Sequence, residues 1–194
     1  MKLVLASASP RRRELLASLG LVFQVAPAEL DETAREGEAA EAYVVRLARE
    51  KALAISARFP GDLALAADTA VVLDEQILGK PGDDAQLGAA MLRQLAGRTH
   101  RVMTGIAVGG GGALRSQVVT TQVSFRPLTG LEIAWYVATG EGRDKAGGYA
   151  VQGRAGAFIT SLEGSPSNVV GLPLAESLEL LGEAGYPLPW SGAR

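Results

Sequence analysis

The chain has 194 residues, of which 47% are hydrophobic and 21% are charged, values that are ordinary for a globular protein. Its formal net charge of -2 argues against a general nucleic-acid or membrane-surface binder, because no broad basic face is available. The absence of cysteine excludes disulfides and thiolate nucleophiles, and the single histidine, His100, excludes multi-histidine zinc chemistry.

The start of the chain carries too short an apolar run for a secretory signal, and no stretch approaches the ~20 apolar residues of a membrane span. We therefore expect a cytoplasmic protein that binds neither nucleic acid nor a membrane. The length is most simply that of one domain, which we place at 1–186, followed by a C-terminal tail at 187–194.

Apolar periodicity and cap residues predict strands and helices in alternation. In chain order they indicate a strand over 2–6, a helix over 10–19, a strand over 21–25, a long amphipathic helix over 39–58, a strand within 62–74, a helix over 83–95 capped by Asp83, a hairpin of 101–108 with 114–125, a helix over 129–138, a strand over 157–162 and a helix over 174–181. This interleaving predicts the α/β class with a mixed sheet.

Three consecutive arginines occupy the first turn of the first predicted helix. Ser9 and Pro10 are typical of a helix start, and residues 11–13 then add cations at the end that already carries a partial positive charge. At least one arginine should face solvent, since successive helical residues point about 100° apart. We favour a phosphate site made by Ser7, Ser9, free backbone N–H groups and one or two of the arginines, because an anion would offset the repulsion.

The segment AADTAVVLD puts Asp68 within a predicted strand, where aspartate is unfavourable. One interpretation is that Asp68 ends the strand and caps a turn. The alternative places it at a sheet edge, facing a metal ion or a nucleophilic water, because a lone buried carboxylate is costly. Glu29, Asp31 and Glu32 in the preceding polar loop could add oxygen ligands for Mg²⁺, although each taken singly is more simply solvated.

Lysines and a glycine-rich segment offer further candidates. Among Lys51, Lys80 and Lys145, Lys80 has the strongest local case, because glycine and proline hold it in the turn GKP. The segment DKAGGYAVQG is either a surface turn or a loop that lets backbone approach a ligand. There Tyr149 offers a stacking face, and the Gln152 amide could pair with a pyrimidine edge.

His100, in GRTHRVMTG, is predicted to be a structural hydrogen-bonding residue rather than a catalytic base.

Taken together, these segments resemble the Maf family of nucleoside triphosphate pyrophosphatases from residue 3 to about residue 181. The resemblance rests, in order, on LASASPRRRELL, DET, YVVRLAREKA, AADTAVVLD, GKP, GRTHRVMTG, DKAGGYAVQG and NVVGLPL. The form of DKAGGYAVQG is similar to the branch that acts on dTTP and UTP rather than to the branch that prefers 7-methyl-GTP. The resemblance implies a mixed twisted sheet flanked by helices, as in inosine triphosphate pyrophosphatases, with an active-site cleft.

The resemblance also implies an activity: hydrolysis between the α- and β-phosphates to a nucleoside monophosphate and pyrophosphate, with Mg²⁺ or Mn²⁺. A house-cleaning role against non-standard nucleotides, a link to septum formation and a homodimer belong to the same expectation. Two alternatives stay open, namely a nucleotide-sensing cell-division regulator that acts by binding, and a pyrophosphatase that prefers purine triphosphates.

Site residues carried over by the resemblance fall into four groups. They are Asp68 as the catalytic carboxylate; Arg12, Thr69 and Gln152 for base selection; Ser7, Arg11, Lys51 and Lys80 around the triphosphate; and Glu32 with Asp68 beside the metal.

Overall fold

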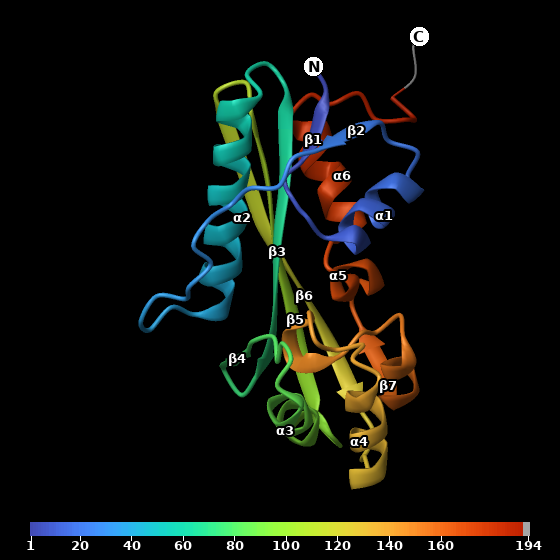
Figure 1. Ribbon diagram of the computed structural model, residues 1–194. Helices are drawn as coiled ribbons and strands as arrows, with labels where there is room; N and C mark the ends of the chain where they lie inside the picture. The colour runs from blue at the N-terminus through green and yellow to red at the C-terminus, as the bar shows by residue number, and fades with distance from the viewer. Residues whose placement is uncertain (192–194) are drawn as a thin grey trace. The chain divides into compact units, whose positions relative to one another are not determined.

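A computed structural model describes residues 1–191, in which a mixed seven-stranded sheet is flanked by helices (Figure 1). The elements are β1 (Leu3–Leu5), α1 (Pro10–Ser18), β2 (Phe23–Val25), α2 (Ala40–Arg58), β3 (Leu63–Leu73), β4 (Gln76–Leu78), α3 (Ala85–Leu95), β5 (Thr99–Gly110), β6 (Ala113–Phe125), α4 (Gly130–Ala138), the 3-10 helices η1 (Ala146–Gly148) and η2 (Arg154–Phe158), β7 (Ile159–Glu163), α5 (Pro166–Val170) and α6 (Leu174–Glu183). The strand order is β2-β1-β3-β5-β6-β7, with β4 paired to β3. Strand β1 is parallel to β2 and β3, whereas β3–β4 and β6–β7 are antiparallel, so the predicted mixed α/β sheet is confirmed.

The chain forms two compact units, and β3, β5 and β6 contribute residues to both. Unit 1 comprises Met1–Asp68, Thr104–Val119 and the described residues from Gly171 onward, and unit 2 comprises Thr69–Met103 and Thr120–Val170. The single domain over 1–186 stays a prediction. In the expected tail over 187–194, Leu188 packs against the core of unit 1, and residues 192–194 lie outside the described residues.

Alternation along β1 and β3 sorts the side chains of unit 1 onto two faces. One face packs against α1 and α6 through larger residues: Leu3, Leu5, Leu63, Leu65, Leu16 and Leu180. The other packs against α2 through smaller ones: Val4, Ala6, Ala64, Ala66, Ala48 and Ala52. Figure 1 shows α2 on one side of these strands and α1 and α6 on the other. Because Asp68 continues the series of Ala64 and Ala66, its side chain falls on the α2 face.

Two glycines of β5 let α2 lie close to the sheet within unit 1. A Cβ at Gly105 would lie 2.3 Å from the carbonyl oxygen of Val44, and one at Gly109 would lie 3.3 Å from that of Ala52. Any larger residue at Gly105 would therefore push the helix away. This close approach brings the α2 residues between Val44 and Ala52 against the strands.

Unit 2 has its own aromatic and aliphatic core, which includes Phe125, Tyr136, Tyr149 and Phe158. Its helix α4 begins with a capping box, in which Thr129 and Glu132 satisfy each other's backbone N–H groups.

The N-cap of helix α3 lies one residue later than predicted, and the helix itself begins at Ala85 rather than at residue 83. Asp84, rather than Asp83, is its N-cap, and the Asp84 carboxylate accepts from the N–H groups of Gln86 and Leu87. The expected cap at Asp83 is therefore wrong.

Most predicted elements are confirmed, with ends displaced by one or two residues. Strand β4 and helix α5 are additions that the sequence did not indicate. They have 3 and 5 residues. Among residues 1–191, no helix combines the length and the apolar composition needed to cross a bilayer.

Candidate functional site

A buried lysine joins two carboxylates in unit 1. The Nζ of Lys51 donates to Oδ1 of Asp68 at 2.7 Å and lies 2.5 Å from Oε1 of Glu32. The side chains of Lys51 and Asp68 are 7% and 11% exposed, whereas that of Glu32 is 47% exposed. The cluster is therefore enclosed by protein around Lys51 and Asp68 and reaches solvent through Glu32.

The position of Lys51 on α2 explains why a charge is buried here. Leu47 and Ile55, four residues on either side, are buried on the same face of the helix. A buried ammonium needs a counter-ion, and Asp68 on the α2 face of β3 supplies it. Lys51 therefore joins Asp68 as predicted for a cation beside this carboxylate, and its place in the apolar stripe of a helix was a usable signal.

Asp68 lies in the interior of β3. It follows the residues that pair with β1, Leu63–Leu65, and precedes those that pair with β4, Val71–Leu73. The interpretation that Asp68 ends the strand and caps a turn is therefore wrong. Its carboxylate is instead held by the salt bridge to Lys51.

The start of α1 adds a guanidinium and a hydroxyl to the same unit. Arg12 donates from Nε to the carbonyl oxygen of Gly171 at 2.7 Å and from Nη1 to Oγ of Ser7 at 3.3 Å. Burial lowers the pKa of Arg12, while the negative charges of Asp68 and Glu32 act in the opposite direction. Arg12 therefore lies within electrostatic reach of both carboxylates.

The arginine prediction is confirmed in part. Arg13 is exposed, as expected for at least one of the three, whereas Arg11 and Arg12 are half-buried. The backbone N–H groups of Ser9 and Arg12 are already bonded, to Oγ of Ser7 at 3.2 Å and Oγ of Ser9 at 3.4 Å. The serine side chains therefore cap these two N–H groups, and a phosphate site at the start of α1 stays a prediction.

Of the three acids proposed in the polar loop, only Glu32 joins the cluster. Asp31 instead accepts from the N–H and hydroxyl of Thr33, at 2.9 Å and 2.6 Å, and these bonds lower the pKa of Asp31. Glu29 is exposed. Asp31 thus shapes the backbone on either side of Glu32.

The donor set is compatible with a hard divalent cation that arrives with phosphate. Within residues 1–191, no group of three or more histidine, aspartate or glutamate side chains is arranged to hold a metal ion. Asp68 and Glu32 nevertheless meet at one nitrogen atom. Mg²⁺ commonly uses one or two carboxylates and completes its shell with water and substrate phosphates, and this pair suits that mode.

The other predicted residues belong to unit 2. Lys80 and Gln152 are exposed, and Thr69 is half-buried. The turn that carries Lys80 contacts the glycine-rich loop, because Gly147 N–H donates to the carbonyl oxygen of Gly79 at 3.0 Å. That Thr69, Lys80 and Gln152 share a site with the Lys51 cluster stays a prediction.

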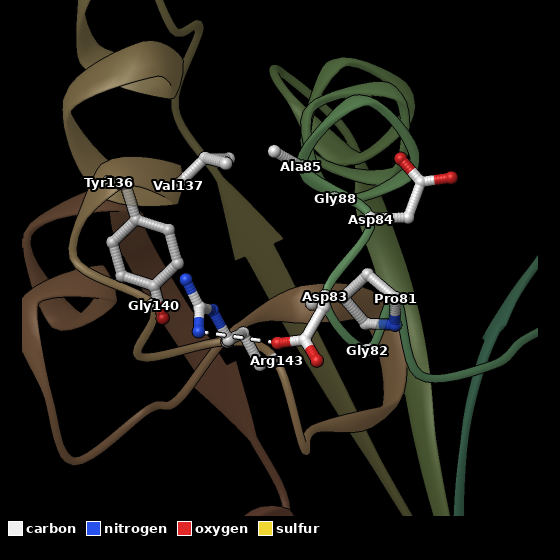
Figure 2. Close-up of a pocket in the computed structure, with 12 residues that line it drawn as sticks. Pro81, Gly82, Asp83, Asp84, Ala85, Gly88, Tyr136, Val137, Gly140 and Arg143 are labelled. Atoms are coloured by element: carbon white, nitrogen blue, oxygen red, sulfur yellow. Dashed lines mark ion pairs between the residues drawn. The ribbon is translucent and has the colours of Figure 1, made fainter.

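Unit 2 also contains a pocket next to this turn (Figure 2). It is lined by Pro81, Gly82, Asp83, Asp84, Ala85, Gly88, Tyr136, Val137, Gly140, Gly142, Arg143 and Gly148. Across it, Nη1 of Arg143 lies 3.2 Å from Oδ1 of Asp83, as the dashed line in Figure 2 marks. The lining includes none of the predicted site residues, so the expected active-site cleft stays a prediction.

His100 is confirmed as a structural residue. Its Nε2 lies 2.7 Å from the hydroxyl of Tyr149, and the two rings pack edge-on in a buried cluster with Phe125. Tyr149 is only 5% exposed. The expectation that Tyr149 offers a stacking face to a base is therefore wrong, because the apolar ring is used in the core of unit 2.

Sequence reasoning missed two residues that hold the Glu32 segment. Tyr43 donates to the carbonyl oxygen of Glu32 at 3.0 Å, and Arg46 donates to that of Thr33 at 3.2 Å. In the sequence, Tyr43 counts only as one apolar residue of the amphipathic helix predicted over 39–58. The sequence signal that could have indicated this pair is the spacing of three residues between Tyr43 and Arg46, which places both on one face of the helix.

Comparisons with known proteins show the family of this chain. The family model described as "Maf-like protein" matches residues 2–184, and the chain belongs to that family. A protein of Myxococcus xanthus (strain DK1622) named "dTTP/UTP pyrophosphatase" is 57% identical over 188 residues, which cover 97% of this chain and 95% of the relative. A relative of the same name in Anaeromyxobacter sp. (strain Fw109-5) is 57% identical over 194 residues, covering 97% and 92%.

Among solved structures, a HAM1 protein from Coxiella burnetii is similar at a TM-score of 0.49 and 17% identity. The match covers 95% of this chain and 98% of that chain.

Proposed function

We propose that this chain hydrolyses dTTP and UTP to the nucleoside monophosphate and pyrophosphate. The observation that carries the proposal is the buried Lys51–Asp68 pair, joined by the more exposed Glu32 and within electrostatic reach of Arg12. Cations next to carboxylates suit a triphosphate that enters with a divalent ion. Relatives at 57% identity that are named dTTP/UTP pyrophosphatase support the same assignment.

Asp68 is the residue to which we assign water activation. Lys51 donates to Oδ1 and so orients the carboxylate, to which we assign alignment of the attacking water or acceptance of its proton. Hydrolysis by direct in-line attack then needs no covalent intermediate.

The positive charges of Lys51, Arg11 and Arg12 stabilise the negative charge that develops on the leaving pyrophosphate. A divalent cation, when bound, would neutralise phosphate charge, and Asp68 and Glu32 are the residues that would hold it.

Base selection is assigned to Gln152, with Arg12 and Thr69. The Gln152 side chain is exposed, and its amide can both donate and accept, as a pyrimidine edge requires. A site that hydrogen-bonds a base discriminates strongly against a base that leaves its polar groups unpaired. A homodimer, a cytoplasmic location and a role in septum formation stay predictions from the sequence.

The test is pyrophosphate release from a panel of nucleoside triphosphates with Mg²⁺ or Mn²⁺, for the parent chain and for Asp68→Asn. We expect UTP and dTTP to react fastest and Asp68→Asn to lower kcat by a factor on the order of 10²–10⁴ while still binding nucleotide. Asp74→Asn is the matched control, because this exposed acid directly follows β3.

Each alternative has its own outcome in this assay. Near-normal turnover of Asp68→Asn would remove Asp68 from the mechanism. Faster cleavage of purine triphosphates would change the substrate class. Binding without any release of pyrophosphate would favour the nucleotide-sensing regulator.

A further inference from the structure

The segment that carries Glu32 lacks regular secondary structure, yet its carboxylate lies on Lys51. Residues 29–37 are exposed and form neither helix nor strand. The contact with Lys51 reaches only the Glu32 side chain, and the exposure of that carboxylate weakens the ion pair. Two side chains of α2 contact the backbone of this segment directly.

Arg46 of α2 makes the most extensive of these contacts. Its Nε and Nη2 donate to the two carboxylate oxygens of Glu38, at 2.6 Å and 2.7 Å. The same Nη2 donates to the carbonyl oxygen of Thr33 at 3.2 Å. The side chains of Arg46 and Glu38 are only 14% and 9% exposed, so this two-pronged pair is better shielded from solvent than an ordinary surface ion pair.

Glu38, which is held by Arg46, also bonds the backbone of the segment that carries Glu32. Its Oε2 also accepts from the backbone N–H of Arg35 at 3.0 Å, and the bond with Arg46 is the main cause that lowers the pKa of Glu38 to about 2. Arg35 in turn pairs with Glu50 of α2 at 3.3 Å. The backbone from Thr33 to Glu38 is thus attached to the helix at both ends.

Tyr43, one turn before Arg46 on α2, holds Glu32 itself. Its hydroxyl donates to the backbone carbonyl oxygen of Glu32 at 3.0 Å. Burial, with the charges of Asp68 and Glu32, raises the pKa of Tyr43 to about 12, so the hydroxyl keeps the proton it donates at neutral pH. Tyr43 and Arg46 therefore bind two consecutive carbonyl groups from one face of the helix.

We propose that Tyr43 and Arg46 are positioning residues, which hold the backbone of Glu32 and Thr33 on α2 so that the Glu32 carboxylate meets Lys51. Neither residue is assigned contact with substrate. The catalytic part of this inference rests on the proposed function, in which Glu32 acts beside Asp68, whereas the positional part concerns only the folded chain.

Amide hydrogen exchange tests the positional part without any nucleotide. In Tyr43→Phe, which keeps the ring, we expect the amides of residues 32–38 to exchange about fivefold faster. In Arg46→Gln the increase should be on the order of tenfold or more, and largest at Arg35. Arg49→Gln is the matched control, since Arg49 lies on the same helix but bonds Ser116 instead.

Unchanged exchange in both test variants, or an equal increase in Arg49→Gln, would overturn the positional proposal. Exchange across the rest of α2 should stay at the parent level, which separates a freed segment from general unfolding.

A double-mutant cycle with Glu32→Gln tests the catalytic part. We expect Arg46→Gln to lower kcat about tenfold in the parent chain but to add little in Glu32→Gln, because both changes act through one carboxylate. An equal loss in both backgrounds would show that Arg46 does not act through Glu32. If the parent chain releases no pyrophosphate, the proposed function fails, and the exchange experiment still decides the positioning role.

Discussion

Because His100 is buried and neutral, we expect the free energy of unfolding to fall in mild acid. A substitution of His100 by a residue that cannot titrate should remove this part of the pH dependence. His100 is 2% exposed, and burial lowers its pKa from 6.5 to about 4. Among residues 1–191, its Nδ1 finds no hydrogen-bond partner, while Nε2 contacts the Tyr149 hydroxyl. A proton added to the folded chain would therefore place a charge in an aromatic cluster.

The sign follows from which state binds the proton. Between pH 6.5 and pH 4 the unfolded chain protonates His100 and the folded chain does not, so the free energy of unfolding falls as the pH falls through this window. With 1.36 kcal/mol for each pKa unit, a shift from 6.5 to about 4 removes about 2 kcal/mol by pH 5 and about 3 kcal/mol by pH 4. Above pH 7 His100 is neutral in both states, so this loss of unfolding free energy is absent.

The assay is urea unfolding followed by circular dichroism at pH 7, 6, 5 and 4, for the parent chain and for His100→Gln. Glutamine cannot titrate, and its amide can still bond the Tyr149 hydroxyl. We expect the difference in unfolding free energy between the two proteins to change by about 3 kcal/mol from pH 7 to pH 4, with the parent chain losing more. A difference that is independent of pH would refute the assignment of a buried, neutral His100.

Two further predictions concern unit 1. Lys51→Met should cost about 3 kcal/mol of unfolding free energy, because it leaves the Asp68 carboxylate buried without its partner. In an Asp68→Asn background the same change should cost much less. Equal losses in both backgrounds, measured by urea unfolding, would contradict this. Gly105→Ala should cost roughly 1–3 kcal/mol and lower turnover, because its Cβ would lie 2.3 Å from the carbonyl oxygen of Val44. Gly109→Ala, where the approach is 3.3 Å, is the matched control and should cost less in a thermal melt; the reverse order would show that helix approach is not limiting.

Local patterns were sufficient for most of the fold. Ser9 and Pro10 marked the start of α1, and the apolar stripe around Leu47 marked α2, because caps and helical periods depend on neighbours in the chain. The same reasoning placed the α3 cap at Asp83 instead of Asp84, since two adjacent aspartates offer the same chemistry.

The chemistry of the site was predictable by residue type but not by contact. An acid within a strand marked Asp68 as a functional candidate, and the structure pairs it with Lys51. Local patterns favoured Lys80 over Lys51, and they assigned a base-stacking role to Tyr149, which is buried. Lys51 and Asp68 are separated by a loop and a strand start. The apolar stripe of α2 indicates that Lys51 is buried, but it does not specify which carboxylate this lysine meets.

What the sequence by itself determined is the order of strands and helices, the residues available for charge chemistry and the family. The tertiary structure decided which of those residues meet. Alternation puts Asp68 on the α2 face, Gly105 lets that helix lie close, and Tyr43 and Arg46 hold Glu32 in place. The physical reason is the sequence separation of the interacting residues. Helix caps and apolar periods depend on residues a few positions apart. A buried ion pair depends on how a helix packs on a sheet, and that packing involves residues distant in the sequence.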